Sequence, residues 1–151
     1  MTDRRRELMA EEDAAWHELD TIVDGLGPDL MTRSDLTPEG WSVKDLLAHL
    51  AAWMAEAACQ LERIRGGTYR DEALDVDAMN AEFYEANKDL PVNVVWAELH
   101  AARTRMLTEL DALPEVTSDA EEWFVESGVK HYGEHLPQLR DWVVGRLGSD
   151  G

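Results

Sequence analysis

Apolar side chains recur at steps of three and four residues along four long stretches of the sequence, which is the spacing of helices that each bury one stripe. The stretches cover residues 3–25, 42–66, 92–113 and 117 onward. No stretch of comparable length shows the strict alternation of a half-buried β-strand. We therefore expect an all-α fold, a four-helix bundle formed by a single domain over residues 1–151.

The second of these helices has the most clearly marked start. Ser42 is a good N-cap residue, and Asp45 three positions later completes a capping box. The long crossover between the second and third helices, residues 66–92, is too long for a tight turn, and the spacing inside it predicts a short extra helix over 76–87. Residues 27–40 are expected to form a loop.

The last segment has two plausible starts. One is the capping box within Thr117–Glu121, and the other is the pair Ser127-Gly128. Further along, Pro137 lies inside the helical pattern, where its ring meets the carbonyl of the residue four positions earlier. We expect a kink at that point.

The charge of the chain limits its partners. It carries 32 acidic against 14 basic side chains, a formal net charge of −18 at pH 7, which repels phosphate backbones and anionic lipid surfaces. We therefore expect a small-molecule substrate rather than a nucleic acid or a membrane as partner. The one cysteine, Cys59, excludes an internal disulfide and fits a cytoplasmic location, and no apolar stretch is long enough to span a bilayer.

Two histidines in the last segment, His131 and His135, are spaced so that their side chains leave the same face of a helix, one turn apart. Helices use this spacing to offer two nitrogen ligands to one metal ion, and His49 in the second helix is the candidate for a third. Three neutral imidazoles leave a divalent ion with open positions, as in catalytic sites. The alternative is that these are core histidines bonded to carbonyl or carboxylate groups. Both interpretations are open from the residues alone.

Other side chains are candidates for the chemistry around these histidines. Glu134 is rotated off the line of the pair, so it either orients a ligand or is a solvated surface acid; we take it as the candidate catalytic residue. Trp53, Trp96 and Trp142 are candidates for the walls of a substrate pocket, against the simpler interpretation of core residues. His100 either lines the same cavity or lies at the edge of the bundle.

The stretch Trp41–Leu50, with its Trp-x-x-Lys-Asp-Leu-Leu-x-His-Leu pattern, a central segment with Asn80 and the late His131-Tyr132-x-Glu134-His135 together resemble the DinB/YfiT-like superfamily. The resemblance covers almost the whole chain. It implies a four-helix bundle with up-down-down-up topology and a divalent metal, zinc or nickel, held by three side chains. The matching positions in this sequence are His49, His131 and His135.

Two branches of the superfamily look closest. One contains the N-terminal domain of mycothiol-dependent maleylpyruvate isomerase and the bacillithiol transferases, which use the metal to activate a low-molecular-weight thiol. That isomerase has a glutamate at the position of His131 and an additional C-terminal domain not found in these 151 residues, which argues against its particular reaction here. The other is the ClbS/DfsB group, which is similar in the same two motifs and protects against a reactive metabolite.

The resemblance thus implies a metal-dependent enzyme that activates a small thiol or water for attack on an electrophilic small molecule, either as a detoxifying transferase or as an isomerase. The alternative is a ClbS/DfsB-like protein that binds or hydrolyses a reactive metabolite without a metal. A third interpretation is a homodimeric scaffold whose site is vestigial.

Overall fold

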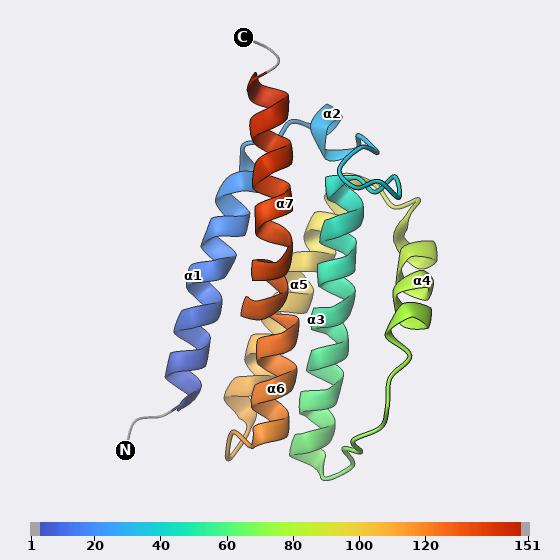
Figure 1. Cartoon of the computed structure of the whole chain (residues 1–151). Helices are drawn as coiled ribbons and strands as arrows, with labels where there is room; N and C mark the ends of the chain where they lie inside the picture. Colours follow the sequence, from blue (N-terminus) through green and yellow to red (C-terminus); the bar gives the residue numbers. More distant parts are fainter. Residues whose placement is uncertain (1–3, 149–151) are drawn as a thin grey trace.

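The computed structural model describes residues 4–148, and every regular element in that range is a helix (Figure 1). The elements are α1 (Arg4–Asp24), α2 (Pro28–Met31), α3 (Val43–Gly66), α4 (Val76–Asn87), α5 (Val92–Ala112), α6 (Ser118–Ser127) and α7 (Val129–Gly148). α6 and α7 stack end to end, so the bundle has four columns: α1, α3, α5 and α6–α7. Chain direction runs up, down, down and up, which confirms the predicted topology.

The crossover between α3 and α5 carries the predicted extra helix. α4 covers Val76–Asn87 and lies outside the bundle against α3. Asp75 begins it, because its carboxylate accepts a hydrogen bond from the backbone N–H of Ala78 at 3.1 Å. The predicted loop over 27–40 was wrong at its start, where α2 forms one turn. Pro28 favours that turn, since its fixed φ suits the first position of a helix.

The two proposed starts of the last segment are both used. The side chain of Thr117 accepts a hydrogen bond from the N–H of Ala120 and begins α6, which ends at Gly128. A Cβ atom on Gly128 would lie only 2.8 Å from the carbonyl oxygen of Phe124, so the break requires glycine. α7 then begins at Val129 and continues through Pro137 without ending. A bend at Pro137 stays a prediction.

α3 lies at the centre of the core. It packs along α5 and also contacts α4 and α6, so residues on most of its turns are buried. The fully buried large side chains of the core come from α1, α3, α5, α6 and α7, and they are Leu8, Leu19, Leu47, Leu50, Met54, Leu61, Leu99, Met106, Leu110, Phe124, Tyr132 and Leu139. His49 is therefore carried by the helix with the most extensive packing.

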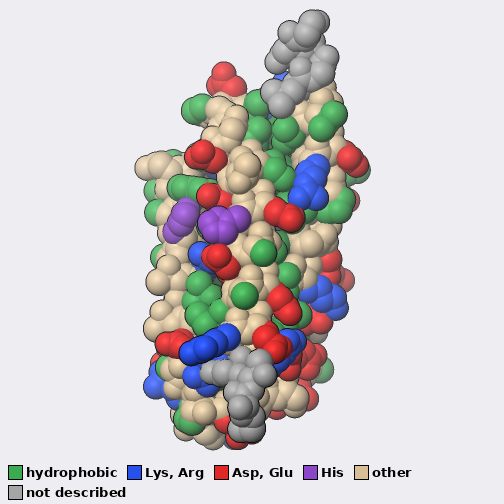
Figure 2. Space-filling model, turned by 90° about the vertical axis from the view of Figure 1, so that its left-hand side faces the viewer, with side chains coloured by type: hydrophobic (Ala, Val, Ile, Leu, Met, Phe, Trp, Pro, Cys, Tyr) green, Lys and Arg blue, Asp and Glu red, His purple; other side chains and the backbone are tan. Residues whose placement is uncertain are grey.

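The surface is charged in both signs, with acidic groups in excess. Figure 2 shows acidic and basic side chains interspersed along one face of the bundle. Ion pairs join neighbouring columns, for example Arg140 of α7 with Glu18 of α1 at 2.8 Å and Arg4 of α1 with Glu121 of α6 at 2.6 Å. No helix within residues 4–148 combines the length and the apolar character that a membrane crossing requires.

The capping box of α3 gives a direct test of how this helix is anchored. The Ser42 hydroxyl accepts from the N–H of Asp45 at 3.2 Å, and the Asp45 carboxylate accepts from the N–H of Ser42 at 2.9 Å. We expect Ser42→Ala to lower the free energy of unfolding by about 1 kcal/mol. Ser118→Ala, at an exposed position next to the true cap Thr117, should change it by less than about 0.5 kcal/mol. Urea unfolding of both variants measures the difference, and equal losses would contradict a capping role for Ser42.

Candidate metal centre

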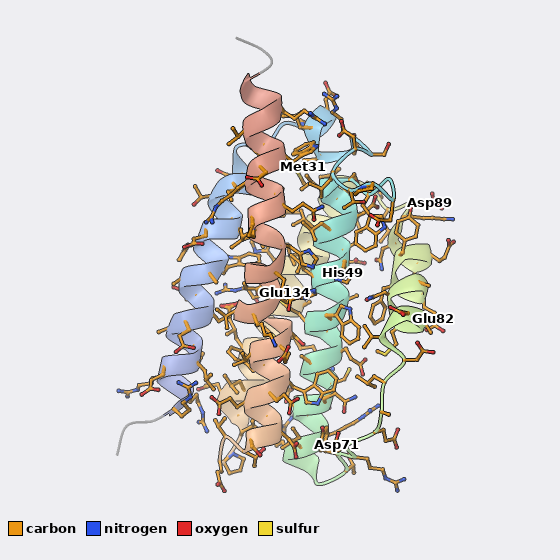
Figure 3. The ribbon with its side chains drawn as sticks, viewed as in Figure 1. Met31, His49, Asp71, Glu82, Asp89 and Glu134 are labelled. Carbon is orange, nitrogen blue, oxygen red and sulfur yellow. The ribbon has the colours of Figure 1, made fainter. Side chains whose placement is uncertain are left out.

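Three histidines from two helices meet midway along the bundle. His49 projects from α3, and His131 and His135 project from successive turns of α7. Each offers a ring nitrogen, and the three nitrogens all lie within 4.8 Å of one another. Figure 3 shows His49 and Glu134 at the same height, where α3 and α7 face each other. The structure thus brings together residues that are 82 positions apart in the chain.

The spacing of these nitrogens suits a shared ion. Nε2 of His49 lies 3.0 Å from Nε2 of His131. Two imidazoles that bind one zinc ion at about 2.0–2.1 Å place their nitrogens about 3.0–3.4 Å apart. Modest side-chain rotation brings the third nitrogen into the same range, because the widest separation within the set is no more than 4.8 Å.

Burial disfavours the protonated form of all three imidazoles. Burial lowers the pKa of His49 to about 4, with a further contribution from His135. Burial likewise lowers the pKa of His131 to about 3, aided by repulsion from the other two rings. The pKa of His135 is lowered by its burial, although the charge of Glu134 acts in the opposite direction. Neutral rings keep the lone pairs that a cation needs.

These rings are not satisfied in the manner of ordinary core histidines. Among the described residues, none of the three donates to or accepts from a carbonyl or carboxylate group. Within residues 4–148, their one hydrogen-bond contact is that between His49 and His131. Nδ1 of His49 is buried and has no hydrogen-bond partner within the described range. The donor set, the spacing and the lack of competing acceptors all fit a divalent cation.

A cavity of about 770 Å³ opens beside the three histidines. Its walls come from α3, α6, α7, the first part of α4 and the connection over residues 68–74. Two tryptophans line it, and each has its N–H group engaged: Trp53 donates to Asn80 at 2.7 Å, and Trp123 donates to the hydroxyl of Tyr69 at 3.1 Å. The cavity is therefore lined by aromatic and charged side chains together with the three imidazoles.

The family of the chain is decided by a match over most of its length. The family model described as the mycothiol maleylpyruvate isomerase N-terminal domain matches residues 13–144. The chain belongs to this family. The DinB-like resemblance read from the histidine motifs is thereby confirmed.

Solved structures show the same fold. An uncharacterised protein from Escherichia coli UTI89 superposes with a TM-score of 0.82 at 15% sequence identity, over 95% of this chain and 94% of that one. A protein from Streptococcus pneumoniae superposes with a TM-score of 0.77 at 16% identity, over 94% of this chain and 91% of that one. None of the curated proteins matches the chain.

In this member of the isomerase-domain family, only part of the predicted pocket faces the histidines. Trp53 lines the cavity, as does Glu134, which is exposed on α7. Trp96, His100 and Trp142 do not. Trp96 stacks on Trp16 of α1, and His100 lies against the same two tryptophans.

The position of Trp142 has a separate cause. Its indole N–H donates to the carboxylate of Asp35 at 3.1 Å, beyond the end of the cavity. Helical spacing placed these side chains on core-facing stripes. A helix in a bundle has neighbours on two sides, and the stripe does not say which neighbour a border residue meets.

Other cavity residues were not predicted. Trp123 and Ser127 of α6 precede His131 at steps of four, and all three line the cavity. Ser127 is 4% exposed and Gln60 of α3 is 7% exposed. Residues 123, 127, 131 and 135 recur every four positions, and this spacing could have indicated that Trp123 and Ser127 lie near the histidines. The pair Ser127-Gly128 instead suggested that the helix was interrupted there.

The lowered pKa values predict a pH-dependent stability for the metal-free protein. Unfolded histidine takes up its proton near pH 6.5, whereas His131 does so near pH 3 when folded. Between these values the unfolded state binds more protons, so the free energy of unfolding decreases as the pH falls below about 6.5.

We expect wild-type protein in the presence of a chelator to lose about 1–2 kcal/mol more between pH 7 and pH 5.5 than His131→Gln does. Urea unfolding at the two pH values measures the difference. His17→Gln, at an exposed position outside the site, should behave as wild type. A decrease that is the same in all three proteins would mean that the buried imidazole does not titrate in this way.

Proposed function

We propose that this domain is a metal-dependent enzyme: His49, His131 and His135 bind a divalent cation, zinc or nickel, and the cavity binds a small thiol, or water, with an electrophilic small molecule. The observation that carries the proposal is the convergence of three neutral imidazoles within 4.8 Å in the wall of a cavity. A divalent cation held by such a set lowers the pKa of a thiol or water that reaches it and polarises carbonyl groups.

The protein's own groups serve the reaction in distinct ways. The imidazoles hold the cation without neutralising it, because burial keeps them uncharged and they bring no negative charge. A glutamate in place of His131, as in the isomerase that the sequence resembles, would reduce the net charge of the site by one. Three neutral ligands therefore favour binding of an anionic sulfur or oxygen nucleophile.

Glu134 is the proposed proton acceptor. It follows His131 by three positions, precedes His135 directly, and lines the same cavity. A carboxylate at the cavity wall can take the proton that a thiol or a water loses when it becomes a nucleophile. The indole faces of Trp53 and Trp123 then hold the apolar part of the electrophile, and about 770 Å³ lies within the range of small-molecule sites.

A small thiol is the nucleophile that the family favours. The family description names mycothiol, and the match extends over residues 13–144, which include all three histidines. Attack of sulfur on an electrophile gives either a stable adduct, as in a transferase, or a reversible one, as in an isomerase. The cavity residues do not distinguish these outcomes, and the proposal covers both.

One observation favours a second candidate. Nε2 of His49 and Nε2 of His131 are 3.0 Å apart, so one hydrogen between them satisfies both rings without an ion. In that case the domain is a protective protein of the ClbS/DfsB type that binds or hydrolyses a reactive metabolite without metal. Metal content separates the two candidates.

Metal content is therefore the first test. We expect the purified protein to contain close to one divalent metal ion per chain by mass spectrometry, and His131→Ala and His135→Ala to lose it. The melting temperature of the wild-type protein should fall by several degrees with a chelator, because a ligand of the native state stabilises it.

His100→Ala and His17→Ala are the matched controls, because both remove an imidazole outside the cavity. They should retain the metal and the response to chelator. A metal-free wild-type protein that folds normally and ignores the chelator would support the second candidate instead.

Thiol chemistry is the second test. Protein loaded with zinc or nickel should accelerate the loss of a small thiol in the presence of a model electrophile, and Glu134→Gln should slow that reaction by about 10²–10⁴-fold while the metal content is unchanged. Glu126→Gln, which removes another carboxylate of the cavity wall, is the control and should have little effect. Equal rates for the Glu134 variant and the wild type would remove Glu134 from the mechanism.

A further inference from the structure

A buried charge lies in the core of the bundle, among residues that do not line the cavity. The side chain of Glu12 on α1 is 0% exposed, and its carboxylate is bound by the guanidinium of Arg103 on α5 through Nη2–Oε1 at 2.6 Å and Nε–Oε2 at 2.8 Å. The hydroxyl of Tyr132 on α7 donates to the same carboxylate at 3.0 Å and lies 3.1 Å from the sulfur of Met54 on α3. We call these four residues the Glu12 network.

Stability alone does not explain this network. Removing a carboxylate from water is costly, and replacing buried ion pairs with well-packed apolar residues is often neutral or stabilising. Apolar contacts are also tolerant of small rotations, because they have no preferred direction. Hydrogen bonds to a carboxylate fix both distance and angle. The distinctive effect of the Glu12 network is thus to fix how the helices are placed relative to one another.

The network lies at the level of the histidines. Tyr132 follows His131 directly, and successive residues of a helix point about 100° apart, so anchoring one side chain sets the direction of the next. Met54 lies five positions after His49 on α3. The contact between Tyr132 and Met54 therefore connects the same two helices that supply the three imidazoles, between one and two turns of α3 from His49.

The start of α7 makes such an anchor necessary. The α6–α7 column is interrupted at Gly128, so α6 does not impose its rotation on α7 through a continuous helix. A Cβ atom on Gly128 would lie 3.5 Å from Cγ of Glu12, which shows that the Glu12 side chain packs against the break itself. Tyr132, four residues after the break, is fully buried and donates to the carboxylate of Glu12.

We infer that the Glu12 network sets the rotation and height of α7 and so aims His131 and His135 at His49. Tyr132, Glu12 and Arg103 are positioning residues in this account, since none of them lines the cavity. The role of this alignment in metal binding rests on the proposed function, because aligned imidazoles matter most if they share an ion. The alignment itself is measurable without any metal.

The test is Tyr132→Phe, which removes one hydroxyl and leaves the Glu12–Arg103 pair in place. Val23→Ala is the matched control: it shortens a buried side chain of α1 far along the helix from Glu12 and lowers stability with the network intact. Both variants and the wild type are labelled with ¹⁵N-histidine, and the ring nitrogen signals are recorded in the metal-free state.

We expect the ring signals of His49 and His131 to move in Tyr132→Phe and to keep their wild-type positions in Val23→Ala. Titration with Co²⁺ should then show about a tenfold weaker affinity and an altered visible absorption spectrum for Tyr132→Phe only, the scale of effect typical of residues that orient ligands. Thermal unfolding of the three proteins shows whether stability follows the same order.

Unchanged ring signals in Tyr132→Phe, or equal changes in Val23→Ala, would overturn the inference. A wild-type protein that binds no Co²⁺ would overturn the proposed function but not this alignment, and the metal-free ring signals would then be the only test of the inference. Moved ring signals with an unchanged Co²⁺ affinity would also overturn the inference, because the network would then not control the metal-binding geometry.

Discussion

The burial of three uncharged imidazoles between α3 and α7 is the constraint on which the rest of the site depends. Protonated rings at this spacing would repel one another and lose their hydration, and the lowered pKa values of His49 and His131 express that cost. No carbonyl or carboxylate within the described residues relieves it. One divalent cation could be shared by three neutral nitrogen donors at this spacing, and this is the basis of the proposed metal site.

Much of the scaffold could be predicted because its signals are local. The capping box of Ser42 and Asp45 and the spacing of residues 76–87 each involve side chains within a turn or two of one another, and both are found where expected. The single turn over Pro28–Met31 was missed, since one turn is too short to show periodicity. The pair Ser127-Gly128 was predicted as an alternative to a helix start within Thr117–Glu121. The structure uses both: α6 begins after Thr117, and α7 begins after Gly128.

The site could be predicted only in part, because its walls depend on which helices become neighbours. The histidines were found from their spacing and from a family resemblance. Trp96 was predicted to face a substrate but packs on Trp16, since α5 meets α1 on that side. Trp123 was not among the predicted pocket residues, yet it lines the cavity and donates to the hydroxyl of Tyr69 in the crossover. Helical periodicity cannot predict contacts between α6 and the irregular backbone of the crossover.

The buried carboxylate of Glu12 connects the core packing of α7 with the position of its histidines. It occupies a position in the buried stripe of α1, between Leu8 and Trp16, where an apolar residue would pack at lower cost. Its carboxylate is instead compensated by Arg103, and the remaining hydrogen bond goes to Tyr132, the neighbour of a candidate ligand. Apolar packing of Leu136 and Leu139 turns one face of α7 inward but tolerates small rotations of the helix. A directional contact made by Tyr132 can therefore determine what the adjacent His131 presents to the cavity. Under the proposed function, the energetic cost of the buried charge is offset by the precision of that site.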